Sequence, residues 1–416
     1  MKRREIDDTT LRELAERFGT PLYVYRAETI AARAGVLLSA RSGGRGFDVV
    51  RYAQKANPNL SILRLVRSLG CAVDAVSAGE LHRALAAGFD AREVLFCSDL
   101  LDPAALELLH RHPFRLNAGS ADMLAAYAHS NPPRRDVVLR VNPGFGHGHD
   151  PRVATGGEGS KHGIWHEDLP AVAAEAEQLG LEVTGLHVHV GSGSDLEHLE
   201  RARGVLERAA GSFERTLAML SAGGGLPVPY REGEPRFDPE PLLEGWNATR
   251  ERLERRLGRA ISLEIEPGRY LVAEAGVLLA RVRGAKRSGS TDYVLVDAGF
   301  HNLVRPAMYG AYHEISIVGR DGEALRPCVV AGPLCESADV FTQGKNGRVE
   351  PRPLPPARSG DLVCLHDAGA YGAAMSSGYN SQLPAAEVML QNGAPRLVRP
   401  RPSFADALAP EIDCLE

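Results

Sequence analysis

The sequence lacks the features that mark membrane, nucleic-acid-binding and disulfide-bonded proteins. Its 416 residues contain no apolar run of membrane-spanning length, and a formal net charge of −5 argues against nucleic acid or an anionic membrane as the main partner. The six cysteines form no close C-x-x-C pair, so neither a zinc knuckle nor a disulfide framework is implied. No G-x-G-x-x-G follows an expected strand, and nicotinamide binding is therefore not supported.

What remains is the composition of an ordinary globular enzyme. The chain is 44% hydrophobic and 24% charged, and it is long enough for two or three domains. Its basic first residues have no apolar segment behind them, which argues against a secretory signal. We therefore expect a cytoplasmic protein with reduced thiols.

Between residues 47 and 266 an apolar run alternates with a helical pattern eight times. The expected strands are residues 47–53, 71–76, 94–98, 114–118, 136–141, 183–189, 218–222 and 261–266. The expected helices are residues 58–68, 78–87, 120–128, 167–179, 195–210 and 239–257. Eight such alternations predict a closed (β/α)8 barrel, with an open doubly wound sheet as the alternative.

A barrel of this kind carries its functional groups at the C-terminal ends of the strands. Lys55 follows the first expected strand, Asp74 ends the second, Arg140 the fifth and His189 the sixth. The loops after strands six to eight contribute Ser192, Gly224, Gly225, Glu266, Gly268 and Arg269. Each position alone has an ordinary explanation, such as a solvated charge or a turn glycine. Their joint placement at one end of the barrel favours a shared chemical role.

That role is consistent with pyridoxal phosphate (PLP). Burial at a strand tip would lower the pKa of Lys55 and free its amine to attack an aldehyde. The glycines on either side of Ser192 and around Gly224 would let backbone N–H groups approach a phosphate. Glu266 is the candidate partner of a pyridine nitrogen, and His189 is the candidate to stack on the ring.

From about residue 275 the pattern changes to short strands without helices between them. These are residues 277–282, 293–297, 328–330, 362–366 and 387–390, and Asn392-Gly393 is a strong hairpin signal. A mainly antiparallel β domain is predicted. Near the start, a helix with a Thr10/Glu13 capping box precedes a strand at residues 22–25 that could join this domain. We expect boundaries at 1–29 for this helix and strand, 30–272 for the PLP-binding barrel and 273–416 for the β domain.

Several motifs, taken together, resemble those of the alanine-racemase-like, fold-type III PLP-dependent decarboxylases. They are residues 52–57, the Gly-Ser-Gly after His189, the triple glycine at 223–225, and residues 266–269, 335–337 and 367–371. Within this family, residues 140–149, 155–165 and 305–309 are similar to those of bacterial diaminopimelate decarboxylases. The resemblance extends from about Phe18 to Val398.

The resemblance implies a role for each matching position. Lys55 would bind PLP covalently, and Cys335 would be the acid that returns a proton after carbon dioxide leaves. The implied cofactor-binding residues are Lys55, Asp74, Arg140, His189, Ser192, Gly224, Gly225, Glu266, Gly268, Arg269 and Tyr371. The implied substrate contacts are Arg269, Arg305, Tyr309, Glu336 and Tyr371. Family members are homodimers in which the Cys335 loop reaches the partner's site. No metal is implied, and we interpret His147, His149 and Asp150 as loop residues.

The implied reaction converts meso-2,6-diaminopimelate to L-lysine and carbon dioxide, the last step of bacterial lysine biosynthesis. The far end of this substrate carries both a carboxylate and an ammonium. Arg305 can pair with the carboxylate, and Glu336 can accept from the ammonium. With a substrate such as ornithine, Arg305 would be a buried charge without a distal carboxylate to satisfy it.

Some positions depart from the family pattern, and they keep other substrates open. His301 and Asn302 stand where Asn-Asp is usual, Gly378 replaces Asn, Gln382 replaces Arg, and Ala338 replaces Gly. The alternative is a PLP decarboxylase of the same fold that acts on another basic or conjugated diamino acid, such as ornithine or arginine. A racemase, and a non-catalytic PLP carrier, are more distant alternatives.

Overall fold

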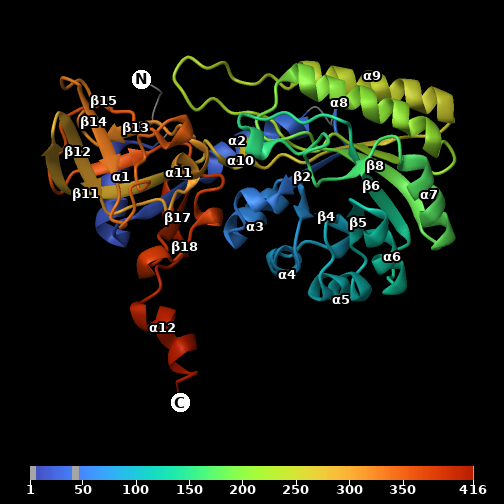
Figure 1. The fold of residues 1–416 in the computed structure, drawn as a ribbon, viewed down its shortest axis with the longest axis horizontal. Helices are drawn as coiled ribbons and strands as arrows, with labels where there is room; N and C mark the ends of the chain where they lie inside the picture. Colours follow the sequence, from blue (N-terminus) through green and yellow to red (C-terminus); the bar gives the residue numbers. More distant parts are fainter. Residues whose placement is uncertain (1–5, 40–45, 416) are drawn as a thin grey trace. The chain divides into compact units, whose positions relative to one another are not determined.

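The computed structural model describes residues 6–39 and 46–415, and the expectations for residues 1–5, 40–45 and 416 lie outside it. The chain divides into two compact units (Figure 1). Unit 1 runs up to Ile30, includes residues 229–235 and resumes at Val272. Unit 2 comprises residues 31–228 and 236–271.

Unit 2 is a closed barrel of eight parallel strands, as the sequence predicts. Its strands are β2 (Val49–Ala53), β3 (Ala72–Ala75), β4 (Val94–Ser98), β5 (Arg115–Ala118), β6 (Asp136–Asn142), β8 (Glu182–Val188), β9 (Met219–Ser221) and β10 (Ser262–Ile265). They pair in this order around the ring, which closes where β10 pairs with β2. A two-residue strand, β7 (Ile164–Trp165), pairs with β6 outside the ring. The open-sheet alternative is therefore excluded.

Helices follow most of these strands. They are α3 (Leu60–Ser68), α4 (Ala78–Ala87), α5 (Pro103–Arg111), α6 (Ala121–His129), α7 (Leu169–Gln178), α8 (Leu196–Ala209) and α9 (Glu240–Leu257). Each of α3 to α6 contacts the next helix in the series, and α8 contacts α9. Local sequence sets their ends. Ser77 accepts from the Glu80 N–H at the start of α4, and Gly88 adopts the left-handed conformation that ends this helix. All six predicted helices are confirmed, while α5 was not predicted.

Unit 1 is built on a mainly antiparallel sheet. Its strands are β1 (Leu22–Arg26), β11 (Gly276–Ser288), β12 (Thr291–Val296), β13 (Ile315–Ile317), β14 (Arg326–Ala331), β15 (Arg352–Leu354), β16 (Leu362–Leu365), β17 (Ala386–Gln391) and β18 (Ala394–Arg399). The early strand β1 lies between β11, to which it is antiparallel, and β17, to which it is parallel. The hairpin predicted at Asn392-Gly393 joins β17 to β18.

A hydrophobic core joins α1 (Asp8–Phe18) to this sheet. Leu11 and Leu14 of α1 pack with Leu22 of β1, Leu279 of β11 and Val388 of β17. The helix begins earlier than the sequence indicated.

The capping box predicted at Thr10 and Glu13 is wrong, because Asp7 caps α1 and accepts from the Thr10 N–H at 2.9 Å. Unit 1 also contains α11 (Arg305–Tyr309) and α12 (Phe404–Ile412), and none of the residues of α12 is buried.

Candidate active site

The lysine singled out in the sequence lies directly after β2, in the 3-10 turn η2 (Gln54–Ala56). The turn is fixed by its neighbour Gln54, whose buried amide donates to the carbonyls of Asp74 and Glu80 at 3.1 Å each. Lys55 is at the predicted end of the strand. Its side chain is exposed, however, so the burial inferred from the strand pattern is wrong.

The charge of Lys55 acts on several groups nearby, and two of them, Asp74 and His189, belong to the predicted site. Burial raises the pKa of Asp74 to about 8, and the charge of Lys55 opposes this rise. The pKa of His189 lies well below its ordinary value, because the surrounding protein disfavours a charged ring and because Lys55 and Arg140 repel it. Near neutral pH the lysine therefore has a protonated carboxyl and a neutral imidazole close to it.

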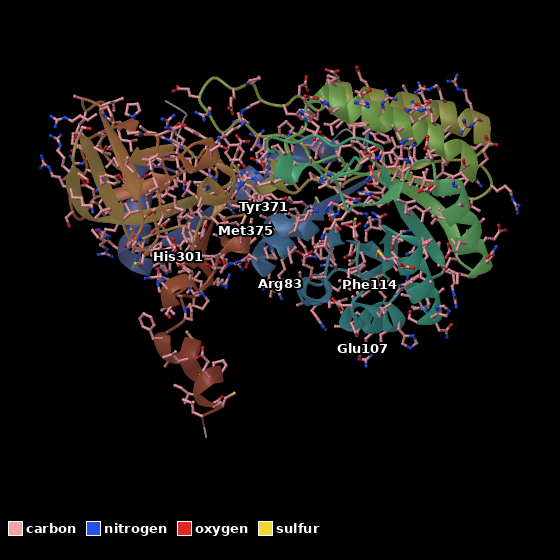
Figure 2. All side chains as sticks on the ribbon, in the orientation of Figure 1. Arg83, Glu107, Phe114, His301, Tyr371 and Met375 are labelled. Carbon is pink, nitrogen blue, oxygen red and sulfur yellow. The ribbon has the colours of Figure 1, made fainter. Side chains whose placement is uncertain are left out.

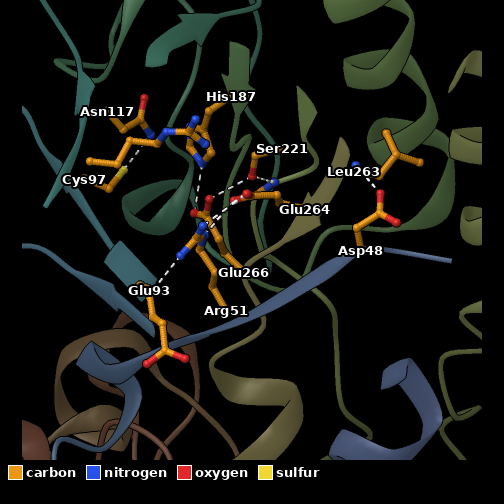
Figure 3. A network of polar contacts seen from close by, with 12 residues as sticks. Asp48, Arg51, Glu93, Cys97, Asn117, His187, Ser221, Leu263, Glu264 and Glu266 are labelled. Atoms are coloured by element: carbon orange, nitrogen blue, oxygen red, sulfur yellow. Dashed lines mark hydrogen bonds and ion pairs between the residues drawn. The ribbon is translucent and has the colours of Figure 1, made fainter. Parts of the chain in front are cut away.

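Glu266 is a buried carboxylate at the end of β10, and both of its oxygens are engaged (Figure 3). The Ser221 hydroxyl donates to Oε1 at 2.7 Å, and His187 Nε2 lies 3.0 Å from Oε2. Burial alone would raise the pKa of Glu266, but His187 and Ser221 outweigh burial and lower it to about 2. The carboxylate consequently stays ionised inside the barrel.

A second buried ion pair lies within the barrel and includes Glu264, two residues before Glu266. Arg51 on β2 donates to Glu264 on β10, from Nε at 2.6 Å and from Nη2 at 3.0 Å (Figure 3). A planar guanidinium facing a carboxylate in this way restricts the orientation of both side chains. The pair links the first and last strands of the ring beneath the functional residues.

The glycines after β8 and β9 allow backbones to approach closely. Gly191, Gly193, Gly223 and Gly225 all have positive φ. A Cβ on Gly224 would collide with the Glu266 carbonyl, although its φ is not positive. These residues bring three strand-end loops together.

Most backbone N–H groups of these loops are used inside the protein. Gly193 donates to the Gly225 carbonyl at 3.0 Å, and Gly224 donates to His189 Nδ1 at 3.2 Å. Ser192 donates to the Val153 carbonyl at 3.2 Å. Most of the N–H groups predicted to approach a phosphate therefore donate within the protein, and the phosphate-binding role of these glycines stays a prediction.

Side chains provide donors at the same loops. Arg269 donates to Ser192 Oγ from Nη2 at 2.8 Å and from Nε at 3.2 Å. Since that oxygen accepts both bonds, the Ser192 hydroxyl hydrogen points to another acceptor. Arg140, at the end of β6, lies 3.8 Å from an oxygen of Asp99. Arg269 and Arg140 both bring a guanidinium to this end of the barrel.

Gly268 fits closely against the turn that carries Lys55. A Cβ there would lie 3.0 Å from the Ala53 carbonyl oxygen and 3.1 Å from the Ala56 Cβ. The loop after β10 and the turn after β2 are thus in direct contact. All ten sequence-predicted site residues of unit 2 lie at strand ends or in the loops that follow them.

The other predicted residues lie in unit 1, in separate groups. Arg305 begins α11 and is only 2% exposed, while Tyr309 ends that helix and is half-buried. Arg305 Nη1 lies 2.8 Å from His313 Nε2, and its guanidinium lies over the ring of Tyr230, 4.9 Å from the centroid.

Cys335 and Glu336 form an exposed pair in the loop after β14. Glu336 Oε1 accepts from the Tyr379 hydroxyl at 2.6 Å, and the Cys335 N–H donates to Asn380 Oδ1 at 3.0 Å. The loop is therefore attached to the short turn η8 (Tyr379–Ser381), while Cys335 and Glu336 remain exposed.

Tyr371 lies in a loop whose backbone is constrained. Asp367 and Tyr371 both have positive φ, at 55° and 57°, which is uncommon for residues with side chains. The Ala368 N–H donates to the Gly276 carbonyl at 2.7 Å and anchors the loop to β11. Figure 2 labels Tyr371 and His301 on this unit.

The positions that depart from the family pattern differ in their surroundings. His301 and Asn302 are buried in the turn before α11, and burial lowers the pKa of His301 to about 4. The Tyr23 hydroxyl donates to the Asn302 carbonyl at 2.6 Å. Gly378 is exposed and Gln382 is half-buried, on either side of η8.

Two residues that support Glu266 were missing from the predicted site. His187 precedes His189 by two positions within the predicted strand 183–189, so strand alternation predicts both on the same face. Ser221 directly precedes the small-residue run that contains the triple glycine. These positions were the available signals, but the hydrogen bonds themselves join strands 45 and 79 residues apart.

The side chains present in unit 2 fit PLP. Lys55 offers an amine for an aldehyde, Glu266 offers an ionised carboxylate for a pyridine nitrogen, and Arg269 with Ser192 offers donors for a phosphate. His189 offers a neutral ring for stacking. The fold and these groups define a PLP-dependent enzyme of the barrel class.

Comparison with known proteins gives the family. The pyridoxal binding domain of the pyridoxal-dependent decarboxylases matches residues 43–273. Diaminopimelate decarboxylase of Escherichia coli K12 is 49% identical over 411 residues, covering 97% of this chain and 96% of the relative. The chain therefore belongs to the diaminopimelate decarboxylase family of PLP-dependent decarboxylases.

Solved structures agree with this assignment. A crystal structure of diaminopimelate decarboxylase matches with a TM-score of 0.91 and 48% identity, covering 97% of this chain and 96% of that one. The Helicobacter pylori enzyme, complexed with L-lysine, matches with a TM-score of 0.87 and 30% identity, covering 97% and 99%. Across residues 6–39 and 46–415, no helix has the length and apolarity needed to cross a membrane.

Proposed function

We propose that this protein decarboxylates meso-2,6-diaminopimelate to L-lysine and carbon dioxide in the cytoplasm, as the last step of lysine biosynthesis. The observation that carries the proposal is Glu266, a buried carboxylate kept ionised by His187 and Ser221 at the same barrel end as Lys55. The full-length similarity to diaminopimelate decarboxylases supports the choice of substrate.

The barrel residues would hold the cofactor. Lys55 would bind PLP covalently with Asp74 beside it, Glu266 would pair with the ring nitrogen, and His189 would stack on the ring. When bound, PLP supplies an electron-withdrawing ring that accepts the electron pair left on the substrate carbon as carbon dioxide departs. The remaining proposed cofactor-binding residues are Arg140, Ser192, Gly224, Gly225, Gly268, Arg269 and Tyr371. Their support is geometric, because the loops that carry most of them meet at one end of the barrel.

Cys335 would complete the reaction. Decarboxylation breaks a C–C bond and leaves the electron pair on carbon, so one proton must be supplied to that carbon. A thiol is a suitable donor, and Cys335 is exposed on a loop held by Asn380. Exposure of both Cys335 and Glu336 within one chain supports a homodimer in which this loop serves the partner's site.

Residues of unit 1 would recognise the far end of the substrate. Arg305 would bind the distal carboxylate, and Glu336 would accept from the distal ammonium. Tyr309, Tyr371 and Arg269 would contribute further contacts. In this proposal residues 30–272 form the PLP-binding domain, residues 273–416 form the β domain, and residues 1–29 join the latter.

Carbon dioxide release by purified, PLP-loaded protein tests the proposal. We expect release from meso-diaminopimelate and none from lysine, ornithine or arginine. Lys55→Ala should abolish release and prevent the borohydride-trapped attachment of PLP seen by mass spectrometry, because no amine remains at that position. Lys286→Ala, at an exposed position of β11, is the matched control and should behave as wild type.

Release from ornithine or arginine instead would contradict the substrate and favour the alternative raised by the departures at residues 301, 302, 378 and 382. Unchanged trapping of PLP in Lys55→Ala would contradict the lysine assignment.

A further inference from the structure

His313 has both of its ring nitrogens committed by their partners. Nδ1 lies 2.8 Å from the carbonyl oxygen of His366, and Nε2 lies 2.8 Å from Nη1 of Arg305. A carbonyl oxygen only accepts hydrogen bonds, so Nδ1 must carry the hydrogen. A guanidinium only donates, so Nε2 must present its lone pair. The contacts therefore select the neutral Nδ1–H tautomer of His313.

Contacts on several sides restrain His313. The ring is only 1% exposed, and the backbone carbonyl of His313 accepts from Arg352 Nη1 at 2.5 Å. The residue lies just before β13, which pairs with β16, and His366 lies just after β16. The Ser316 hydroxyl lies 2.8 Å from His366 Nε2 and adds a contact between the same two strands. The imidazole is thus held at the ends of the paired strands β13 and β16.

Two neutral groups contact Arg305. Its Nη1 meets the lone pair of His313, and its flat face lies over the ring of Tyr230. The Tyr230 ring in turn meets the His313 ring edge-on, with centroids 5.5 Å apart. Neither contact cancels the positive charge of the guanidinium. A cation held in one orientation in this way suits the bidentate recognition of a carboxylate.

We propose that His313 is a positioning residue that orients Arg305 toward the distal carboxylate of the substrate. The proposal rests on the function proposed above, in which Arg305 binds that carboxylate. It assigns the selection of substrates with a distal carboxylate to a group of three residues, Arg305, His313 and Tyr230. Second protonation of His313 would place an N–H against the N–H of Arg305, so the neutral ring is required.

The chemistry of the reaction provides a matched pair of ligands. Decarboxylation removes one carboxylate and leaves the other at the opposite end, so L-lysine keeps the carboxylate that Arg305 would bind. 1,5-Diaminopentane is the same molecule without that group. A change confined to L-lysine binding reports on the carboxylate subsite, whereas a general disturbance affects both ligands.

The experiment measures the affinity of PLP-loaded wild type and of His313→Leu for both ligands by calorimetry, together with KM and kcat for meso-diaminopimelate. We expect the dissociation constant of L-lysine and the KM to rise about tenfold, the change expected for loss of one hydrogen bond to a charged group. Affinity for 1,5-diaminopentane should change less than about twofold. His313→Gln retains an acceptor oxygen and should recover part of the L-lysine affinity.

Coupling to Arg305 is tested in an Arg305→Lys background. There, His313→Leu should weaken L-lysine binding by less than about twofold, because the oriented guanidinium is already absent. Equal weakening of both ligands, full additivity in the double variant, or unchanged L-lysine binding would each overturn the proposal.

These results are distinguishable from failure of the proposed function. If wild type released no carbon dioxide from meso-diaminopimelate, the proposed function would fail, and calorimetry with the two ligands would still decide whether His313 orients a carboxylate-binding Arg305. If turnover were normal and the ligand pair responded equally, only the role of His313 would fail.

Discussion

At the scale of single residues, the barrel end holds two buried carboxyl groups with opposite behaviour. Glu266 has a donor on each oxygen, and its pKa is lowered to about 2. Asp74 has a buried oxygen, Oδ1, without a hydrogen-bond partner among the described residues, and burial raises its pKa to about 8. The charge of His187, together with the hydrogen bonds from His187 and Ser221, keeps Glu266 ionised at neutral pH, whereas burial keeps Asp74 protonated.

The raised pKa of Asp74 predicts a pH dependence of stability in the cofactor-free protein. Between the ordinary pKa of 3.8 and the folded pKa of about 8, the folded state holds a proton that the unfolded state releases. This contribution is complete below about pH 4 and is lost as the pH rises through about 8. Asp74→Asn removes this contribution. As the pH rises from 5.5 to 8.5, the free energy of unfolding should therefore fall by roughly 1–3 kcal/mol less in the variant than in wild type.

Urea unfolding at the two pH values measures the difference. Asp122→Asn, an exposed position at the start of α6, is the control and should keep the wild-type pH dependence. Parallel pH profiles for wild type and Asp74→Asn would contradict the protonated carboxyl.

The sequence was sufficient to place Lys55, Asp74, His189 and Glu266 at strand ends, because alternating apolar runs locate the ends of barrel strands. It was insufficient for their environment. The exposure of Lys55 depends on a 3-10 turn set by Gln54, and the ionisation of Glu266 depends on side chains from two other strands. Such contacts are set by the closure of the barrel and leave no local pattern.

At the scale of elements, glycine positions determine how closely the strand-end loops approach one another. Gly224 lies where a Cβ would collide with the Glu266 carbonyl, and Gly225 lies where it would collide with the Gly191 carbonyl. Backbone atoms cannot move aside as a flexible side chain can. The loops after β8, β9 and β10 therefore depend on the absence of side chains at these points.

Gly224→Ala should destabilise the protein by about 1–3 kcal/mol, the usual cost of overpacking, and should weaken PLP retention by displacing the end of β10. Gly79→Ala is the control, because this glycine lies in α4 and a Cβ there would lie 3.8 Å from Ser77 Oγ, an ordinary contact distance. That change should stabilise by about 0.5–1 kcal/mol.

Urea unfolding, and PLP absorbance after extended dialysis, measure both variants. Equal stability of the two alanine variants would show that the Gly224 contact relaxes without cost.

Most elements were predictable, and the exceptions have physical reasons. β13 and β15 contain three residues each, too few to show alternation. The missed helix α5 begins at a proline capped by Asp102, a common helix start after a loop. The predicted start of α1 was too late, because Asp7 and Thr10 both have side chains that can cap a helix. Only the geometry shows that Asp7 is the cap.

At the scale of the whole molecule, the proposed site draws on two subunits. Lys55 belongs to unit 2, whereas Cys335 is exposed on a loop of unit 1. If Cys335 serves the partner's lysine, each variant lacking one of these residues is inactive alone. A hybrid dimer of Lys55→Ala and Cys335→Ala chains would contain one complete site.

Random reassociation of the two variants should therefore restore about a quarter of wild-type carbon dioxide release, because half of the dimers are hybrids and each has one complete site of two. The variants are mixed after mild dissociation, and each variant reassociated with itself is the control. No recovery in the mixture would place Cys335 and Lys55 of one chain in the same site, and activity of Cys335→Ala by itself would remove Cys335 as the acid.

The position of β1 has a consequence for how the protein is made on the ribosome. Leu22 in β1 pairs with Leu279 in β11 and with Ala386 in β17. Among the described strands, β1 leaves the ribosome first, and it must wait for its neighbours until β17 has been translated. The barrel of unit 2 has all eight strands once residue 265 has emerged. Synthesis from the N-terminus thus imposes an order, in which the unit that contains β1 is completed after the barrel.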